Sequence, residues 1–359
     1  MQLNMNKSGN AMSFIKERQD RQLNGILTNF KNFGRILPAW DVNTTTILAG
    51  KSGDGKSSWV WEHAVVQVID FIYKNPNVTS HIYFFSLELK YTELYIKVFA
   101  TLLYKRFNKV YPREIFMGIG EERLSQEEID YIEVECKPFM TLLDKHVTII
   151  DLDLTPSGIL VEAVSRMQNS TDEYKFVIID TVNAIGIEPG STKQESMKLW
   201  NQEYALKKLR NERNCIVINI MQLDNEASKR AFDRNGQSIY EKYLPSLEAM
   251  GNDKEASRSA SLVLSLFDPS TFDIKVLNGY NVGAFDKKLR FLYVLKNNFG
   301  DKGMSFPFVY HGVSNTWLEV THTPDEFKRD SSLYLQYGIN PVASTEENVR
   351  KKYTTNLED

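Results

Sequence analysis

Residues 50–57, with the sequence GKSGDGKS, have the residue types and the spacing of a loop that holds phosphate groups, here called the phosphate loop. Its three glycines permit backbone conformations that other residues resist, so successive N–H groups can converge on phosphate oxygens. The pattern G-x-x-x-x-G-K-[ST] adds Lys56, which can reach the β- and γ-phosphates, and Ser57, whose hydroxyl group can coordinate Mg²⁺. The predicted contacts to ATP and Mg²⁺ come from Gly50, Ser52, Gly53, Asp54, Gly55, Lys56, Ser57 and Ser58.

The elements on either side of this loop would position it. Residues 45–49 are small, apolar or β-branched and read as a buried strand. Residues 56–67 can form a helix whose N-terminus faces the same anion. A glycine-rich turn that matches the pattern by chance is the alternative, but the strand before the loop and the helix after it favour phosphate binding.

Three further apolar runs, which read as buried strands, lead directly into polar side chains. In parallel α/β sheets, ligands bind at the carboxyl ends of the strands, so these side chains are placed to act on the nucleotide. The runs are residues 81–88, 176–180 and 215–221, and the polar residues are Glu88, Asp180 and Gln222.

Each of these side chains has a role that suits its chemistry. Glu88 can polarise the water that attacks the γ-phosphate, although an acid at this position is also favoured simply because a helix begins nearby. Asp180 can be a metal ligand together with Ser57. Gln222 can hydrogen-bond the γ-phosphate and report its loss. We therefore predict Glu88, Lys56 and Gln222 as catalytic residues.

The composition is that of a globular protein without a global preference for nucleic acid. The 359 residues are 42% hydrophobic and 25% charged, with a formal net charge of −3. Any DNA binding must therefore come from a local basic patch.

Cys136 and Cys215 lie far apart and suggest neither a disulfide framework nor a zinc site, so we expect a cytoplasmic protein. No segment has the ~18 consecutive apolar residues of a transmembrane helix, and we expect no membrane partner.

The order of the predicted elements indicates the fold class and the domains. Strands alternate with helices along residues 25–321, which predicts an α/β domain with a mostly parallel β-sheet flanked by helices, of the P-loop NTPase kind. Residues 1–24 precede it, and 12–24 can form a charged helix that either lies on the domain surface or docks on a neighbouring subunit. Residues 322–359 are expected to be a tail or an appended helix. Further helices are predicted at residues 91–106, 125–143, 155–168 and 196–213, and further strands at 147–153, 261–267, 289–296 and within 305–321.

Two polar loops follow the strands that end at Asp180 and Gln222. The first covers residues 185–195, and the second covers residues 223–260, which is long for a compact domain and therefore indicates a functional or a disordered segment. Basic side chains in the second loop can face a phosphate backbone, although the interspersed acids fit a solvated loop equally well. The predicted DNA contacts are Lys229, Arg230, Arg234 and Lys254.

The order of these motifs resembles that of the DnaB-family replicative helicases, including those of phages. The resemblance covers about residues 25–320 and is carried by ILAGKSGDGKSS, FFSLEL, FVIIDTV, IVINIMQLD and LKNNFGDKG. It implies a RecA-like ATPase domain. In such a domain Lys56 and Ser57 would bind phosphate and Mg²⁺, Asp180 would lie by the metal, Glu88 would activate water and Gln222 would sense the γ-phosphate.

The resemblance also implies an assembly. Members of the family form six-subunit rings around one DNA strand, move 5′ to 3′ and bind ATP between neighbouring subunits. Two loops per subunit face the channel, here residues 185–195 and 224–258, and a ring combines weak basic contacts into one site for single-stranded DNA. A primase or a helicase loader is a further expected partner, and a phage-encoded hexamer would act in the cytoplasm of its bacterial host.

The chain departs from the family pattern at three places. The arginine that normally reaches the neighbour's γ-phosphate is replaced by Asn298, so Lys296 is the candidate for this catalytic role, with Lys302 and Arg290 as alternatives. Such an arginine contributes ~10³–10⁵ to the rate of hydrolysis. Where the family has a DNA-contacting stretch like Arg-Glu-Ser-Gly, this chain has Glu248-Ala249-Met250-Gly251. We also expect no counterpart of the family's separate N-terminal domain, since only about 24 residues precede the predicted ATPase domain.

Three functions are compatible with these residues. The first is an ATP-driven, ring-forming DNA helicase. The second is a RecA-like recombinase or recombination mediator, which uses the same chemistry in open filaments. The third is an ATP-binding replisome scaffold with weak hydrolysis, which the missing arginine favours. The intact set of Lys56, Glu88, Asp180 and Gln222 favours an active enzyme over a scaffold.

Overall fold

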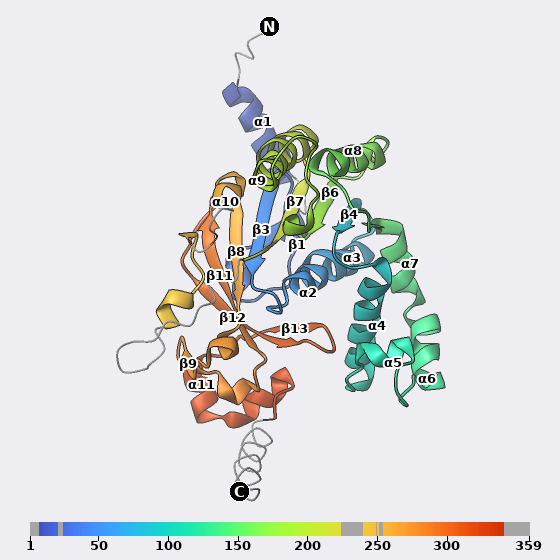
Figure 1. The fold of residues 1–359 in the computed structure, drawn as a ribbon, viewed down its shortest axis with the longest axis vertical. Helices are drawn as coiled ribbons and strands as arrows, with labels where there is room; N and C mark the ends of the chain where they lie inside the picture. The colour runs from blue at the N-terminus through green and yellow to red at the C-terminus, as the bar shows by residue number, and fades with distance from the viewer. Residues whose placement is uncertain (1–6, 21–23, 224–239, 249, 251–253, 341–359) are drawn as a thin grey trace, which may run out of the picture.

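Within the residues that the structure describes, nine strands form a central sheet in the order β13-β12-β11-β8-β3-β7-β6-β4-β5 (Figure 1). The structure is a computed structural model, and it describes residues 7–20, 24–223, 240–248, 250 and 254–340. The strand that leads into the phosphate loop, β3 (Thr44–Gly50), lies in the middle of the sheet between β7 and β8. The predicted fold class, a mostly parallel sheet flanked by helices, is confirmed.

Six neighbouring strands of this sheet run parallel, as expected for strands joined by helical crossovers. Their sequences are nearly continuous apolar runs, because both faces of a parallel sheet are covered. Besides β3 they are β4 (Ser80–Ser86), β5 (Val147–Ile150), β6 (Tyr174–Asp180), β7 (Ile216–Gln222) and β8 (Leu262–Phe267).

The sheet continues beyond β8 with antiparallel strands. β11 (Leu289–Asn297) pairs with β8 and with β12 (Ser305–His311), and β12 forms a hairpin with β13 (Thr316–Glu319). Because β11 runs against β8, the turn after β11 lies at the sheet edge opposite the carboxyl ends of the parallel strands. Short antiparallel pairs outside the main sheet are β1 (Ile26–Leu27) with β2 (Ala39–Trp40), and β9 (Val276–Leu277) with β10 (Tyr280–Asn281).

The helix after the phosphate loop is longer than the sequence predicted. It runs as α2 (Lys56–Val60), a π-helical segment (Trp61–Val66) and α3 (Gln67–Lys74), because Val68, Ile69 and Ile72 continue its buried face. The predicted helix at 125–143 is divided into shorter segments and begins at the expected cap, where Ser125 and Glu128 form a capping box.

None of the helical segments of the described chain is long and apolar enough to cross a membrane. Besides those after the phosphate loop, they are α1 (Lys7–Asp20), α4 (Tyr91–Phe107), α5 (Arg113–Met117), α6 (Gln126–Asp130), η3 (Tyr131–Glu135), α7 (Lys137–His146), α8 (Pro156–Met167), α9 (Lys193–Lys198), η5 (Leu199–Asn211), α10 (Lys254–Ser259), α11 (Pro324–Arg329) and η11 (Ser331–Tyr337), with 3₁₀ turns at Phe33–Arg35, Val182–Ala184, Tyr240–Tyr243, Pro269–Phe272 and Gly283–Phe285.

Two hydrophobic clusters cover the two faces of the sheet. Alternate residues of each strand point to opposite faces, so Ile82 and Phe84 pack into one cluster while Tyr83 and Phe85 pack into the other. The first cluster includes residues of α3, α4 and α7, and the second includes residues of α8, η5 and α10. The sheet is therefore a layer between two sets of helices, and packing on both of its faces fixes the position of the strand ends.

A third cluster is built from the segment between β8 and β11 and from residues near the C-terminus. Phe285 packs edge-on against Phe327 and Tyr334, and Tyr337 and Ile339 are buried in the same cluster. Residues 324–339, expected as part of a tail, are thus packed onto the domain. Sequence patterns did not indicate this because the aromatic residues are spread over short helical turns. Residues 341–359 lie outside the described residues.

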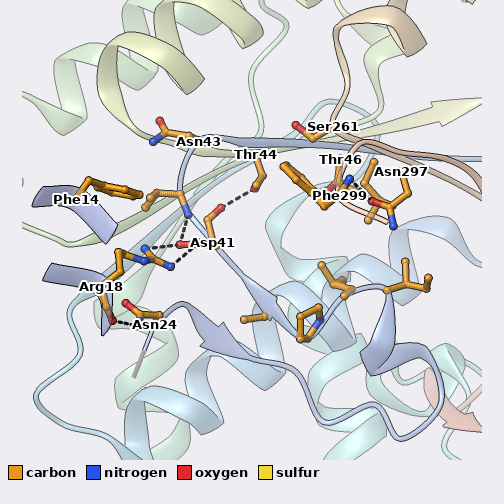
Figure 2. Close-up of a pocket in the computed structure, with 16 residues that line it drawn as sticks. Phe14, Arg18, Asn24, Asp41, Asn43, Thr44, Thr46, Ser261, Asn297 and Phe299 are labelled. Atoms are coloured by element: carbon orange, nitrogen blue, oxygen red, sulfur yellow. Dashed lines mark hydrogen bonds and ion pairs between the residues drawn. The ribbon is translucent and has the colours of Figure 1, made fainter. Parts of the chain in front are cut away.

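The helix α1 contacts its own domain at the amino-terminal edge of the sheet. Arg18 forms a two-point ion pair with Asp41, with N–O distances of 3.1 and 2.6 Å. Beside it lies a cavity of about 470 Å³ whose walls include Phe14 of α1 and Phe299 of the turn after β11 (Figure 2). Met12, Phe14 and Phe299 are exposed, so this edge presents apolar side chains to its surroundings.

Candidate active site

The phosphate loop joins the end of β3 to the start of α2 and takes the closed shape that its glycines permit. Gly53 and Gly55 have φ values of 85° and 94°, in the left-handed region that favours glycine. The N–H of Lys51 donates to Oδ2 of Asp54 over 2.7 Å, and Nζ of Lys56 donates to the carbonyl of Lys51 over 2.7 Å. Lys56 therefore folds back over the loop, where phosphate oxygens would compete for its protons.

Ser57 and Asp180 meet at the carboxyl end of β6. Oγ of Ser57 donates to Oδ1 of Asp180 over 2.7 Å, and Asp180 is only 2% exposed. A hydroxyl and a carboxylate are the hard oxygen ligands that Mg²⁺ prefers, and Mg²⁺ is usually held by one or two protein groups together with phosphates. The structure thus brings the two predicted metal ligands together.

Glu88 lies beside this pair. It follows β4, whose last residue, Ser86, is opposite Asp180 in the register of the sheet. The hydroxyl of Thr181 donates to Oε1 of Glu88 over 2.7 Å, and the N–H of Leu87 donates to the carbonyl of Asp180 over 2.8 Å. These two bonds fix the turn after β4 and orient the Glu88 carboxylate at the edge where the metal ligands lie.

Gln222 reaches the same edge from the next strand. It ends β7 directly opposite Gly50 of β3. The side chain of Asn183 holds its backbone on both sides, accepting from the Gln222 N–H over 2.7 Å and donating to the Gln222 carbonyl over 3.2 Å. The backbone that carries Gln222 is therefore fixed beside the first glycine of the phosphate loop.

Burial shapes the charges of the site. It raises the pKa of Asp180 to about 6, against the opposing effects of the hydrogen bond from Ser57 and the charge of Lys97. Burial also raises the pKa of Asp54 to about 6 and lowers the pKa of Lys56, with nearby carboxylates acting the other way on the lysine. A bound cation would favour ionised Asp180, and a bound polyphosphate would favour charged Lys56. The site is therefore complementary to a metal and a polyphosphate together.

Comparison with known proteins identifies the family. Residues 25–238, more than half of the chain, match the family model described as DnaB-like helicase C terminal domain. The chain belongs to this DnaB-like helicase family. A search of curated proteins found no match.

Two solved structures share the fold of this chain. One, described as the structure of a DnaB-like replicative helicase and its interactions with primase, shares 13% identity, covers 86% of this chain and has a TM-score of 0.65. This chain spans 66% of that protein's length. A second solved structure, described as an ATPase domain, shares 12% identity with a TM-score of 0.64, and the match covers 87% of this chain and 98% of that one.

One predicted nucleotide contact in this DnaB-like domain faces another way. The hydroxyl of Ser58 accepts a hydrogen bond from Nε1 of Trp317 over 2.9 Å and is buried, so this side chain does not face the ligand. The sequence placed Ser58 with its neighbours because it follows the motif directly, but the first helical turn rotates it toward the sheet. Ser52, in contrast, is exposed at the tip of the loop.

Lys296, predicted as a catalytic residue, lies away from its own phosphate loop. It is opposite Val263 of β8, which is in turn level with Ile47, three residues before the loop begins. Its Nζ donates to the carbonyls of Ser257, Arg258 and Ala260, at 2.9, 3.1 and 2.7 Å. The ammonium therefore caps the end of α10. Within its own chain Lys296 cannot reach the nucleotide edge.

The other basic candidates also differ in position. Arg290 is buried at the nucleotide edge and forms an ion pair with Asp268 at 2.9 Å, so its charge is matched within the chain. Asn298 and Lys302 are exposed on the turn after β11, at the opposite edge of the sheet. Of the four positions considered for this role, these two are the ones presented to the surroundings of the molecule.

Four residues that bear on the site were missed by sequence reasoning. Thr181 and Asn183 follow Asp180 closely. The alternation of polar residues in Asp-Thr-Val-Asn could have indicated that these two side chains also lie at the nucleotide edge. Lys97 lies on α4, nine residues after Glu88, and its charge acts on Asp180. No local pattern pointed to Trp317, because its partner Ser58 is 259 residues away.

The predicted DNA contacts fall largely outside the described part of the chain. Lys229, Arg230 and Arg234 lie there, as does the side chain of Lys254, although its backbone begins α10. The first predicted channel loop, residues 185–195, is described. The ammonium of Lys193 donates to the carbonyl of Ile185, and Thr192 caps α9.

Proposed function

We propose that this protein is an ATP-dependent replicative DNA helicase that forms a ring and moves 5′ to 3′ along single-stranded DNA. The observation that carries the proposal is the convergence of the phosphate loop with Glu88, Asp180 and Gln222 at one edge of the sheet, in a chain of the DnaB-like family. Each of these groups comes from a different strand or the turn after it, so a shared ligand explains why they meet.

The residues present fit ATP with Mg²⁺. Ser57 and Asp180 would hold the metal, which supplies charge stabilisation for the phosphates when it is bound. The loop N–H groups and Lys56 would bind the phosphates. Glu88, oriented by Thr181, would accept a proton from the attacking water.

Gln222 would report the nucleotide state to the rest of the molecule. Its backbone is held by Asn183 and lies directly before residues 224–258, the second predicted channel loop. A change at the γ-phosphate would therefore be passed to a segment proposed to contact DNA, which is the coupling that a translocating enzyme needs. Lys229, Arg230, Arg234 and Lys254 are the proposed DNA contacts.

A neighbouring subunit is needed to complete the proposed site. The turn that carries Asn298 lies at the edge opposite the phosphate loop, so its residues can act only on a neighbour's nucleotide. Apolar Phe299 on this turn is 73% exposed, which suits a protein contact. Lys302 is exposed on the same turn, whereas Lys296 would first have to leave the carbonyls that it caps.

The asparagine at position 298 supports a second candidate, an ATP-binding scaffold with weak hydrolysis. Without a cation from the neighbour, the rate of hydrolysis would lack a contribution of ~10³–10⁵. One solved structure is described as a DnaB-like replicative helicase and its interactions with primase. A primase or a loader is therefore the partner that we propose for such a scaffold.

The rate of ATP hydrolysis with and without single-stranded DNA tests the proposal, measured on protein whose mass has been determined with ATP and Mg²⁺. We expect a ring-sized oligomer and stimulation by DNA. Lys56→Ala should abolish hydrolysis, and Lys145→Ala, an exposed lysine on α7, is the matched control. Nucleotide binding with negligible turnover would favour the scaffold, and no nucleotide binding at all would exclude both candidates.

A further inference from the structure

The hairpin of β12 and β13 lies directly against the phosphate loop. Its side chains Tyr310 and Trp317 stack, with ring centroids 4.3 Å apart and an interplanar angle of 14°. A Cβ atom added to Gly55 would lie 2.6 Å from Cζ2 of Trp317 and 2.9 Å from Cε1 of Tyr310. The last glycine of the loop is therefore in close contact with an aromatic pair from a distant part of the chain, which limits the space in which the loop can move.

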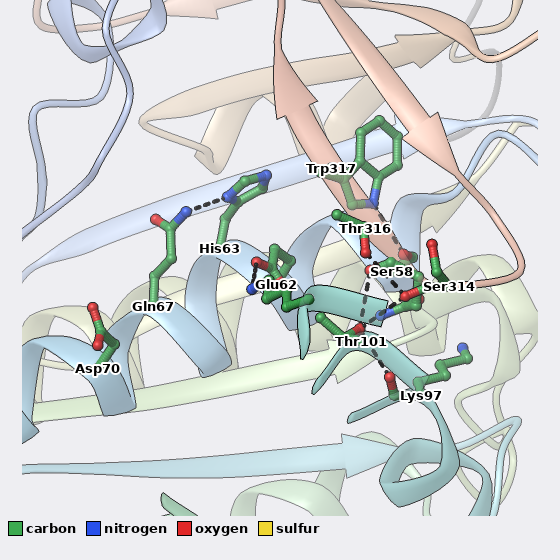
Figure 3. A network of polar contacts seen from close by, with 12 residues as sticks. Ser58, Glu62, His63, Gln67, Asp70, Lys97, Thr101, Ser314, Thr316 and Trp317 are labelled. Carbon is green, nitrogen blue, oxygen red and sulfur yellow. Dashed lines mark hydrogen bonds and ion pairs between the residues drawn. The ribbon is translucent and has the colours of Figure 1, made fainter. Parts of the chain in front are cut away.

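A buried hydrogen bond fixes this contact. Nε1 of Trp317 donates to Oγ of Ser58 over 2.9 Å, as Figure 3 shows, and the two residues are 5% and 3% exposed. Ser58 lies in the first turn of α2, next to Ser57, which bonds Asp180. A buried donor and acceptor of this kind are costly to separate, because neither finds water in exchange.

The turn of the same hairpin is anchored on α4. The Thr101 hydroxyl lies 3.0 Å from the carbonyl of Ser314 and 2.9 Å from the carbonyl of Lys97 (Figure 3). Thr101, Ser314 and Asn315 are all buried. Since α4 begins just after Glu88 and carries Lys97, the hairpin touches both the phosphate-binding element and the helix that follows the proposed catalytic acid.

We propose that the β12–β13 hairpin positions the phosphate loop, with Trp317 as the positioning residue, and that it ties the loop to α4. This inference rests on the proposed function, because it assigns the loop to ATP. It adds to the site an element that no phosphate-loop motif contains. In a DNA motor, such a brace keeps the loop shaped for phosphate while other parts of the ring move.

Trp317→Phe tests the brace, because it keeps an aromatic ring against Gly55 and removes the N–H donor. Loss of one buried hydrogen bond predicts a loss of ATP affinity of about three- to tenfold, with kcat changed by less than about twofold. Amide hydrogen exchange of the phosphate loop, measured without nucleotide, should rise. The matched control is Trp200→Phe, which removes a buried bond of the same kind, from Nε1 of Trp200 to Asn219 over 3.2 Å, on the other face of the sheet.

Ser58→Ala removes the other partner and carries the same test should Trp317→Phe fail to fold. The double variant should raise loop exchange no more than the larger single change, because both substitutions remove the bond between Trp317 and Ser58, and Ser58→Ala additionally removes a hydrogen bond to Tyr310. Equal loop exchange in Trp317→Phe and Trp200→Phe, or additive single changes, would overturn the inference. If the wild-type protein binds no ATP, the proposed function fails. The exchange data without nucleotide would still decide whether Trp317 holds the loop.

Discussion

At the residue scale, the carboxylate of Asp180 is poorly stabilised while its site holds no cation. Burial raises its pKa to about 6 from an ordinary value of 3.8, although Ser57 and Lys97 partly compensate. An acid in this condition binds a divalent metal with a gain that an exposed acid would not have, because the metal restores the favourable environment that burial removed. The ionised carboxylate of Asp180 thus lowers the stability of the metal-free protein and favours the metal-bound one.

This condition predicts how stability depends on pH. Because the pKa of Asp180 is higher in the folded than in the unfolded chain, the folded protein binds more protons between about pH 4 and pH 6. Its free energy of unfolding therefore falls as the pH rises through this window. Asp180→Asn, which keeps an acceptor for Ser57, should remove about 2 kcal/mol of the decrease between pH 4.5 and pH 7.5.

Urea unfolding of the nucleotide-free protein at the two pH values measures this effect. Asp325→Asn is the control, because this acid is fully exposed and its pKa is lowered by a hydrogen bond from Lys328 rather than raised by burial. If Asp180→Asn and the wild type lose the same stability between the two pH values, burial does not destabilise the charged form of Asp180.

Glu88 predicts a separation of binding from chemistry. Glu88→Gln keeps the hydrogen-bonding shape toward Thr181 but cannot accept a proton, so kcat should fall by ~10²–10⁴ while ATP affinity stays within about threefold. Calorimetric binding and steady-state hydrolysis measure the two quantities. Wild-type turnover in this variant would show that another group is the base.

At the element scale, buried strands and their polar ends were the predictable part of the fold. Continuous β-branched runs identified β3, β6 and β7, and the carboxyl-end rule then placed Asp180 and Gln222 at one edge. The helical boundaries were less predictable, because packing rather than local propensity extends the helix after the phosphate loop to Lys74. Contacts such as Trp317 with Ser58 have no local signal, since they join segments far apart in the chain.

The contacts of Lys296 at the end of α10 predict that this lysine stabilises the fold rather than acting in catalysis. Lys296 donates to three carbonyls there, so Lys296→Met should lower the free energy of unfolding by about 1 kcal/mol and change turnover by less than tenfold. Lys302→Met, an exposed lysine six residues further along, is the control. A ~10³-fold loss of turnover in Lys296→Met with unchanged stability would instead assign it the role of the missing arginine.

At the scale of the whole molecule, the two edges of the sheet carry different features. One edge carries the phosphate loop, and the other carries α1, the turn with Asn298, and the apolar side chains Phe14 and Phe299 around a cavity. A head-to-tail contact between copies would bring the second edge of one subunit to the first edge of the next; such contacts give a ring where the rotation between copies closes and an open filament where it does not. This arrangement is how the proposed site would be completed.

Asn298→Arg tests whether that turn faces a neighbour's nucleotide. In the assembled protein, an added guanidinium should raise DNA-stimulated turnover by about tenfold or more, because it supplies charge stabilisation that asparagine cannot. Asp301→Arg adds the same side chain three residues away and should not. The gain should disappear on dilution below the concentration at which the oligomer forms. An unchanged rate at high concentration would place the turn away from the nucleotide.

Unwinding of a forked DNA duplex tests the proposed motor most directly. Two substrates are compared, one in which the strand to be translocated has a single-stranded 5′ tail and one in which it has a 3′ tail. Each is tested with ATP and Mg²⁺, using the wild type and Glu88→Gln. We predict that the wild type separates the strands from the 5′ tail and that Glu88→Gln, although it binds ATP, does not. Unwinding that is absent, that prefers the 3′ tail or that persists in Glu88→Gln would contradict a 5′-to-3′ helicase driven by this site.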